Sequence, residues 1–418
     1  MRFTTILAVL GVLLFAESAR PQGGDPALRS AVERYLTTVE EDAADEVLRD
    51  IVARADVTAQ RLLEIIRERP SVQGRSITVT VPHAGRGIRI ELRIPPGHDE
   101  SSKPLPVLLD ITEGVHLDRL TGGARIIGVA AHGYTPPQFS DEGRDGFAKI
   151  LRTAAHRANG DPDRLWATGF SWAGHATCDN ALHRPGLHAG IAPLGGGPRR
   201  IHFRLLDNLA GTTVLAWCGA KDDPELVWNL RELALRARKH HYRCKVTFDP
   251  DKGHRLPLAD VATLGRRITE AAPLAPLADR GRLLADGRLV ENPLLRIDAV
   301  EERRVRVPRL IPVPSSLSYD GKRRATIRAM RGQVVWVAWT IKRARRRTTI
   351  SLKSRGVTRC TLFLRAPAFK AGDRVRVRAG AKTVFDGPLR PEPRVLLEET
   401  RRTGERLRPA IARLAIAF

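Results

Sequence analysis

The sequence predicts an α/β protein: a mostly parallel β-sheet with helices on both faces, a small helical region before it and a β-rich domain after it. Between residues 76 and 270, short apolar runs alternate with helical stretches, as in a parallel sheet that helices cover on both sides. Two of these runs, 106–111 and 124–132, are apolar almost throughout, as interior parallel strands are. Beyond residue 283 the runs are short and alternate at period two, which is typical of half-buried strands.

Residues 1–18 have the pattern of a secretory signal peptide. A basic start is followed by an apolar run from Phe3 to Phe15, and Ala16 and Ser18 precede the predicted cut after residue 18. The run is shorter than the roughly 20 residues that cross a bilayer, which makes a retained membrane anchor the weaker alternative. We therefore expect a secreted or periplasmic protein with no membrane contact after the signal is removed.

The segment 25–70 is predicted to be a helical N-terminal region. Apolar residues recur at helical spacing over 36–52 and again over 59–69, where Pro70 ends the pattern. Such amphipathic helices need an apolar surface to pack against, and the sequence does not say which one.

The predicted α/β domain spans 76–270. Period-two alternation over 77–82 and 88–96 indicates half-buried strands, and helical patterns occupy 146–158 and 225–240. A segment rich in Ala, Pro and Leu, 271–281, is interpreted as a linker. The basic β-rich domain then spans 283–418, with short alternating runs that include 325–330, 333–339 and 374–380.

Positive charge is concentrated in the last third of the chain. From Gly281 onward there are 33 Lys or Arg residues against 12 Asp or Glu residues, in a chain whose formal net charge is +24. An anion-binding surface is one interpretation. An arginine bias of the coding sequence is the other.

The stretch GFSWAG, 169–174, has the form of a nucleophile elbow. Ser171 follows the short apolar run 165–169 and precedes a stretch that can form a helix up to Pro185. The turn requires very small residues two before and two after the serine, because the serine adopts a positive φ. Gly169 meets this requirement, and Ala173 replaces the usual glycine with the next smallest residue. An ordinary structural serine is the alternative.

Two further residues follow Ser171 in the order that a catalytic triad of this kind requires. Asp222 comes directly after the apolar run 212–219, and His254 lies in the loop after the run 245–250. A neutral histidine can accept the serine proton, and an aspartate can hold the imidazole in the required tautomer. Asp223 is the second choice for the acid, and capping of the next helix is the alternative role for either aspartate.

The span from about Ile88 to Leu256 resembles the α/β-hydrolase family, in particular secreted esterases related to polyhydroxybutyrate depolymerases and feruloyl esterases. The matching stretches are 94–110, DPDRLWATGFSWAGHAT, GIAPLGGG, GAKDD and DKGH. The resemblance implies a mostly parallel sheet with helices on both faces. It also implies that Ser171 is the nucleophile, Asp222 the acid and His254 the base.

The expected oxyanion hole departs from the family pattern. Trp172, directly after the nucleophile, is expected to supply one N–H group. The resemblance places a His-Gly-Gly loop after the strand 106–111, where this chain has Thr112, Glu113 and Gly114. Glu113 or Gly114 is then the expected second donor, with the Glu113 side chain directed to solvent. An altered or weakened site is the alternative.

No metal or cofactor is expected, because the histidines and cysteines lack the spacing of a metal site and the glycine run 195–197 lacks the residues of a phosphate loop. Basic clusters around Trp336 and Trp339 suggest single-stranded nucleic acid, but the two tryptophans are interpreted as core residues, and no nucleic-acid partner is expected. The sequence thus predicts a serine hydrolase acting on small or polymeric carboxylic esters. A serine peptidase and a non-catalytic binding protein of the same fold are the alternatives.

Overall fold

The structure is a computed structural model that describes residues 25–72, 74–121, 123–136, 139–256, 258–305, 316–345 and 347–418. For residues 258–262 it describes the backbone alone. The predicted signal peptide, 1–18, lies outside the described residues. None of the described helices is both long enough and apolar enough to cross a membrane.

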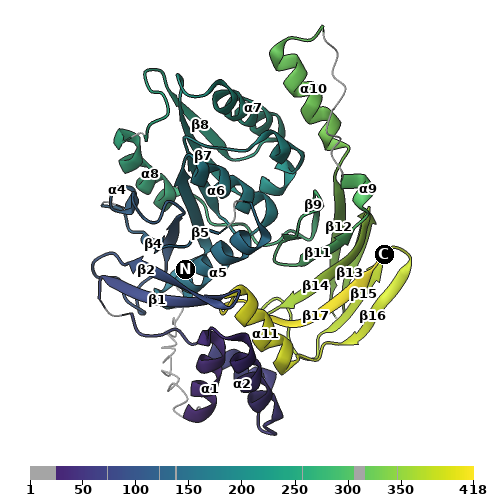
Figure 1. Cartoon of the computed structure of the whole chain (residues 1–418). Helices are drawn as coiled ribbons and strands as arrows, with labels where there is room; N and C mark the ends of the chain where they lie inside the picture. The colour runs from purple at the N-terminus through teal and green to yellow at the C-terminus, as the bar shows by residue number, and fades with distance from the viewer. Residues whose placement is uncertain are drawn as a thin grey trace, which may run out of the picture.

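An eight-stranded sheet forms the centre of the first large region (Figure 1). Its strand order is β1-β2-β4-β3-β5-β6-β7-β8. The first two strands form an antiparallel hairpin that joins β4 antiparallel, and every pairing from β4 to β8 is parallel. The strands are β1 (Ser76–His83), β2 (Arg86–Arg93), β3 (Leu105–Asp110), β4 (Ile127–Ala131), β5 (Gly160–Phe170), β6 (Gly190–Leu194), β7 (Thr213–Gly219) and β8 (Cys244–Asp249).

Helices cover both faces of this sheet, as the sequence predicts. On one face, Leu120 and Leu264 pack with Trp166 and Trp217 of the strands. On the other face, side chains such as Ile150 and Leu182 pack against the strands. The helices of the first face are α4 (Leu117–Thr121) and α8 (Leu258–Glu270), and those of the second are α5 (Asp141–Arg157), α6 (Trp172–His183) and α7 (Pro224–His240), with the short turns η1 (Arg200–Arg204) and η2 (Leu206–Leu209).

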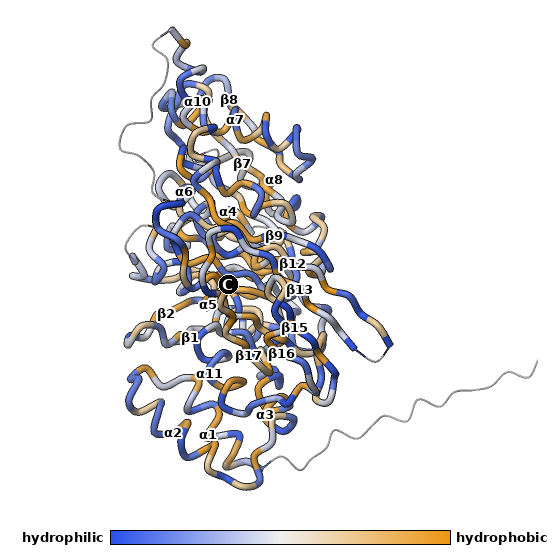
Figure 2. The backbone as a smooth tube through the Cα atoms, turned by 90° about the vertical axis from the view of Figure 1, so that its right-hand side faces the viewer, coloured by the Kyte–Doolittle hydropathy of each residue, from blue (hydrophilic) through white to orange (hydrophobic). Residues whose placement is uncertain are grey.

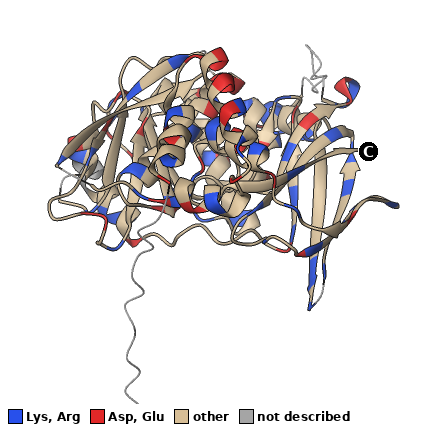
Figure 3. Ribbon diagram, turned by 90° about the horizontal axis from the view of Figure 1, so that it is seen from below, with Lys and Arg blue, Asp and Glu red and all other residues tan. Residues whose placement is uncertain are grey.

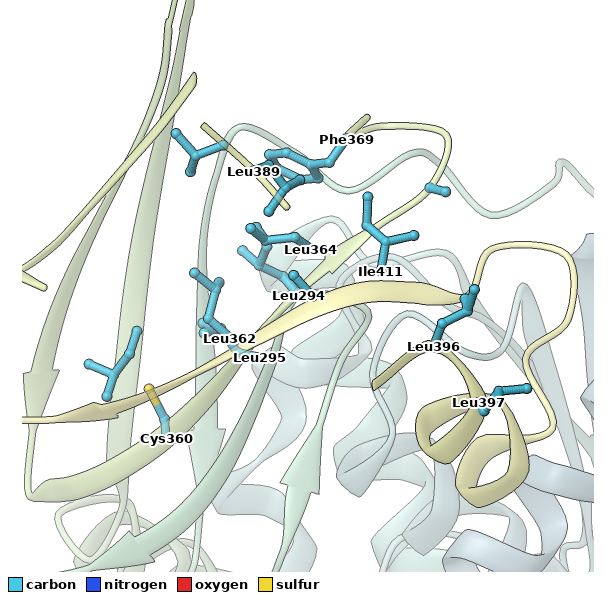
Figure 4. Packing of buried hydrophobic residues seen from close by; sticks show 14 of the residues in the cluster. Leu294, Leu295, Cys360, Leu362, Leu364, Phe369, Leu389, Leu396, Leu397 and Ile411 are labelled. Carbon is cyan, nitrogen blue, oxygen red and sulfur yellow. The ribbon is translucent and has the colours of Figure 1, made fainter. Parts of the chain in front are cut away.

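The C-terminal region contains two sheets with a hydrophobic core between them. One has the order β10-β11-β14-β17 and the other the order β16-β15-β13-β12-β9. Figure 4 shows Leu362 and Leu364 of β14, Ile411 of β17 and Leu396 of α11 within this core. The elements are β9 (Arg280–Ala285), β10 (Val290–Glu291), β11 (Leu295–Val300), α9 (Glu302–Val305), α10 (Tyr319–Arg331), β12 (Val335–Ala344), β13 (Arg347–Arg355), β14 (Val357–Arg365), β15 (Arg374–Ala379), β16 (Lys382–Pro388), α11 (Pro393–Thr403) and β17 (Ala410–Ala417).

The N-terminal helices α1 (Pro26–Thr37), α2 (Glu41–Ala53) and α3 (Ala59–Arg67) pack against this C-terminal region. Leu28 and Leu62 belong to the same hydrophobic cluster as Leu396 and Ile411. Nη1 of Arg401, on α11, donates to two carbonyl groups near the end of α1. Residues of α11, more than 300 positions later, thus supply part of the apolar surface that these helices require. The predicted division into separate domains remains a prediction.

The structure differs from two local expectations drawn from the sequence. The pattern over 36–52 predicts one helix, but the chain is extended at Thr38 and Glu40 and a new helix begins at Glu41. The run 325–330 lies in α10 instead of a strand, and α11 adds another helix to the predicted β-rich domain. The run 305–313 is another of the short alternating runs expected in the β-rich domain, and part of it lies outside the described residues. Short apolar runs do not distinguish a strand from one face of a helix.

The two tryptophans of the basic segment occupy different sides of β12. Trp339 is buried in the sandwich core and donates a hydrogen bond to the Ala278 carbonyl group. Trp336 points the other way and is half-buried against a cluster that includes Ile327 and Val214. Both therefore serve packing, as the sequence interpretation expects.

A buried ion pair joins the C-terminal region to the eight-stranded region. Asp286, in the turn between β9 and β10, has no exposed side-chain surface. Its carboxylate accepts a hydrogen bond of 2.8 Å from Nη2 of Arg204 and lies 3.3 Å from Nε2 of His183. Burial raises the pKa of Asp286, but the hydrogen bond and charge of His183 and the charge of Arg204 outweigh burial and hold this pKa below its usual range.

We expect Asp286→Asn to lower the free energy of unfolding by about 3 kcal/mol at neutral pH, because Arg204 would lose its buried carboxylate. A depressed pKa means that this contribution is complete above the unfolded value of 3.8 and is lost as the pH falls below it. Urea denaturation of both proteins across pH measures the difference. A difference below about 1 kcal/mol, or one that grows on acidification, would contradict the assignment.

Candidate functional site

Ser171 lies on a sharp turn between β5 and α6. Its backbone angles are φ 58° and ψ −119°, a conformation that residues other than glycine rarely adopt. The Ser171 N–H donates a hydrogen bond of 2.8 Å to the Leu194 carbonyl group at the end of β6. A hydrogen bond to the neighbouring strand thus holds the strained residue in place. Its side chain lies at the carboxyl ends of the parallel strands.

Small residues make this turn possible. A Cβ atom on Gly169 would lie 2.5 Å from the Cβ of Ala173, and one on Gly196 would lie 2.4 Å from the Ser171 carbonyl oxygen. A residue larger than glycine would therefore clash at position 169 and at position 196. Ala173 is 4% exposed and its methyl group fits beside Gly169, so the turn accommodates alanine at the position where glycine is usual.

The structure brings Ser171, His254 and Asp222 into one hydrogen-bonded chain. Nε2 of His254 lies 2.8 Å from Oγ of Ser171. Nδ1 of the same ring lies 3.0 Å from each carboxylate oxygen of Asp222. The Asp222 side chain is 2% exposed, whereas that of His254 is 43% exposed. A buried carboxylate therefore holds one side of the imidazole while the other side faces the serine and solvent.

Asp222 is positioned by the turn after β7. Its Oδ1 accepts a hydrogen bond of 2.7 Å from the Asp223 N–H, and Oδ2 lies 3.7 Å from Sγ of Cys218. Burial, with the neighbouring Asp222 charge, raises the pKa of the Cys218 thiol to about 12. Cys218 is therefore a neutral neighbour of the carboxylate in the physiological range.

The side chain of Asp223 has a different role. Its side chain caps α7, accepting hydrogen bonds from the N–H groups of Glu225 at 2.7 Å and Leu226 at 3.4 Å. Of the two adjacent aspartates that the sequence leaves open, the structure brings only Asp222 to His254. The side chains of two consecutive residues in a turn point in different directions. Here the side chain of Asp223 caps the helix, and that of Asp222 faces the histidine.

The loop that carries His254 packs directly on the end of β7. A Cβ atom on Gly219 would lie 2.3 Å from the carbonyl oxygens of both Lys252 and Gly253. The Lys221 N–H also donates a hydrogen bond of 2.9 Å to the Lys252 carbonyl group. A glycine at position 219 thus allows the acid and the histidine to meet, a role that the sequence interpretation does not assign.

Phe170 is a second contributor that the sequence analysis does not identify. Its ring lies against the His254 ring, with centroids 5.0 Å apart and planes inclined by 32°. The imidazole is therefore held by an aromatic neighbour as well as by its two hydrogen-bond partners. The position directly before an elbow serine is the signal that would have pointed to Phe170.

The loop 112–114 lies beside the elbow. Oγ1 of Thr112 accepts a hydrogen bond of 3.2 Å from the Phe170 N–H. Buried Asp110 holds the loop from below, because its carboxylate accepts from the N–H groups of Thr112 at 2.9 Å and His116 at 3.2 Å. The loop is thus tied to the end of β5, directly before Ser171.

Glu113 and Gly114 both adopt positive φ, 57° and 79°. The Glu113 side chain is exposed, whereas a Cβ atom on Gly114 would lie 2.4 Å from the Cβ of Ala130. Within the described part of the chain, no protein group accepts a hydrogen bond from the N–H of either residue. Trp172 is the first residue of α6, where a backbone N–H has no partner within the helix.

Metal binding has no support from side-chain geometry. Among the described residues, no group of three or more His, Cys, Asp or Glu side chains is placed to hold a metal ion. His175, three residues after the elbow tryptophan, has its Nδ1 2.5 Å from the Gly197 carbonyl oxygen. Burial lowers the pKa of His175. The absence of a metal and a cofactor remains a prediction.

No protein-family model and no curated protein matches this chain. Solved structures with a similar fold include Thermogutta terrifontis esterase 2 phosphorylated by paraoxon, with 11% identity and a TM-score of 0.40 over 49% of this chain and 98% of that one. A ferulic acid esterase shares 14% identity with a TM-score of 0.39 over 48% and 100% of the two chains. The Staphylococcus aureus fluorophosphonate-binding serine hydrolase F shares 15% identity with a TM-score of 0.38 over 48% and 98%. Each likeness thus spans about half of this chain.

Proposed function

We propose that the protein is a serine hydrolase that cleaves carboxylic esters through an acyl-enzyme. The observation that carries this proposal is the hydrogen-bonded chain from Ser171 through His254 to buried Asp222, with Ser171 on a strained turn. Neutral imidazole within 2.8 Å of a serine hydroxyl is placed to take its proton, and a buried carboxylate on the opposite nitrogen fixes the tautomer.

Acylation begins when Oγ of Ser171 attacks the ester carbonyl carbon and Nε2 of His254 takes the hydroxyl proton. Asp222 stabilises the imidazolium that forms. Negative charge develops on the carbonyl oxygen, and the N–H groups of Trp172 and of Glu113 or Gly114 are the proposed donors to it. Collapse of the tetrahedral intermediate breaks the ester bond, and the imidazolium gives its proton to the leaving alcohol.

Deacylation repeats these steps with water. His254 takes a proton from a water molecule, whose oxygen attacks the acyl carbon of the Ser171 ester. The proton then returns to Oγ of Ser171 as the carboxylic acid leaves. Each proton that enters the imidazole leaves it within the same half-reaction, so the cycle needs no cofactor.

The proposed setting is the periplasm or the cell exterior, after removal of residues 1–18. The motif resemblance to secreted polyhydroxybutyrate depolymerases and feruloyl esterases supports small or polymeric esters as substrates. Neither a nucleic acid nor a membrane is part of the proposed reaction.

Three measurements on purified protein test the proposal. A fluorophosphonate probe should label the wild-type protein at Ser171, because this reagent reacts only with an activated serine. Short-chain p-nitrophenyl esters should be turned over, while peptide anilides should be turned over more slowly or not at all. Faster peptide cleavage would favour a peptidase. Failure of both labelling and turnover would favour a non-catalytic binding protein.

The loop 112–114 offers a sharp test of the oxyanion site. We expect Gly114→Ala to lower kcat by about 100-fold, because its backbone φ of 79° and contact with Ala130 leave no room for a methyl group and the loop must shift. Glu113→Gln is the matched variant and should change kcat by less than about threefold, because the side chain is exposed. Steady-state ester hydrolysis measures both. A large gain in Glu113→Gln would instead indicate that the carboxylate opposes the developing charge.

A further inference from the structure

The five-stranded sheet of the C-terminal region has one apolar and one basic side. Its strands β9, β12, β13, β15 and β16 carry a single acidic residue, Asp386. Their inward residues, such as Val337, Ile350 and Val377, are buried in the sandwich core. Figure 2 shows hydrophilic and hydrophobic residues alternating along these strands, and Figure 3 shows Lys and Arg recurring along the C-terminal strands.

Strand register places the basic residues on one surface. Arg280, Thr340, Ser351 and Arg378 lie side by side across β9, β12, β13 and β15. The next outward row along the strands runs Lys342, Thr349, Arg376 and Asp386. The row after that pairs Arg347 with Arg374. On the same face, at the other end of these rows, Lys353 lies beside Ala338. Of the exposed cations of this surface, Arg282 pairs with Asp207 at 3.1 Å. We call the others the basic face: Arg280, Lys342, Lys353, Arg355, Arg374 and Arg378.

The carboxylate carried by these strands is paired with a cation outside the basic face. Asp386 is already paired with Arg376 at 2.6 Å and lies 3.7 Å from Arg347. Among the described residues, no carboxylate forms an ion pair with any member of the basic face. Like charges on neighbouring strands repel one another, so an anionic partner would stabilise the face.

The centre of this surface is lined by small side chains. Thr340 and Ser351 are half-buried between Arg280 and Arg378, and half-buried Thr349 lies between Lys342 and Arg376. Ala338 is half-buried between Arg282 and Lys353. Arg280 and Arg378 are three strand spacings apart, about 14 Å. An extended polymer that runs along the strands over these hydroxyl groups would have cations on both of its sides.

Two other anionic partners fit less well. Single-stranded nucleic acid is bound by stacking its bases on aromatic side chains, but Trp336 packs against the eight-stranded region and Trp339 points into the core. Membrane-surface binding uses exposed apolar side chains that enter the lipid, and none of the exposed large apolar residues in the described parts of the chain lies on these strands.

We propose that the basic face binds an acidic polysaccharide, a sugar polymer that carries carboxylate or sulfate groups. Arg and Lys would pair with the anionic groups, and the threonine and serine hydroxyls would bond to sugar hydroxyls. This proposal concerns a surface distinct from Ser171 and its partners, and it stands whether or not the protein hydrolyses esters.

The test measures binding of the full-length protein to polygalacturonate and to dextran sulfate, with neutral dextran as the control. We expect at least one acidic polymer to bind at low salt, with affinity that falls steeply as salt is added, and dextran not to bind. The variant Arg280→Gln/Lys342→Gln/Arg378→Gln should weaken binding by about tenfold, since it removes three exposed charge contacts.

The matched control variant is Arg75→Gln/Lys239→Gln/Arg266→Gln, which removes the same charge from exposed positions elsewhere. It should weaken binding by less than about twofold, and both variants should unfold at the same urea concentration as wild type. Equal weakening by the two variants would overturn the proposal, as would no binding of either acidic polymer. Tighter binding of oligothymidylate or of phosphatidylserine vesicles than of both polymers would also overturn it.

Discussion

Ser171→Ala is expected to abolish ester turnover, lowering kcat for a short-chain p-nitrophenyl ester by about 10⁵-fold or more. The substitution removes the proposed nucleophilic atom, because Oγ of Ser171 is the group 2.8 Å from Nε2 of His254. Alanine should retain the fold, since the main-chain bond to Leu194 does not involve the side chain. Steady-state hydrolysis and labelling by a fluorophosphonate probe measure the loss.

Ser101→Ala is a suitable control, because Ser101 is exposed and lies in a turn held by Asp99. Its turnover should stay within about twofold of wild type. If Ser171→Ala kept more than about one per cent of wild-type activity, another group would have to be the nucleophile.

Asp222→Asn is expected to lower kcat by about 10⁴-fold, the effect that loss of the acid has in triads of this geometry. An amide carries no charge to stabilise the imidazolium, and its NH₂ group disfavours the tautomer in which Nδ1 of His254 carries the proton. The substitution is isosteric, so the hydrogen bond from the Asp223 N–H to the side-chain oxygen can remain. Comparing kcat of the variant with its unfolding curve separates loss of chemistry from loss of fold.

The adjacent residue provides the matched control. Asp223→Asn should change kcat by less than about threefold, because Asp223 caps α7 and asparagine is an equally good cap. The two variants have the same change in charge and volume one residue apart. A larger loss in Asp223→Asn than in Asp222→Asn would reverse the assignment of the acid. Small effects in both would mean that no carboxylate supports His254.

Much of the candidate site can be predicted from the sequence, for a topological reason. Ser171, Asp222 and His254 each follow an apolar run, and the carboxyl ends of parallel strands meet at one edge of a sheet. Three residues far apart in the chain therefore converge once the strands are recognised. Gly169 can likewise be recognised, because only the smallest side chain fits a turn with positive φ.

The choice between Asp222 and Asp223 depends on tertiary structure. Both follow the same strand and both suit the chemistry, and only the direction of α7 decides which carboxylate faces His254. The same holds for Gly219, whose contact with the loop 252–253 joins two segments that are more than 30 residues apart. Phe170 also becomes a neighbour of His254 only when that loop returns over the elbow.

The N-terminal and C-terminal regions also have some features that the sequence determines and others that depend on tertiary structure. Amphipathic periodicity by itself determined that the N-terminal segment forms helices that need an apolar partner, and that most C-terminal runs are strands with one buried side. Only the tertiary structure decided that the partner is the core around α11, that 325–330 is helical, and that Arg280, Lys342 and Arg378 share one surface. Periodicity is a local property of a chain, whereas strand register and helix docking depend on contacts between residues distant in sequence.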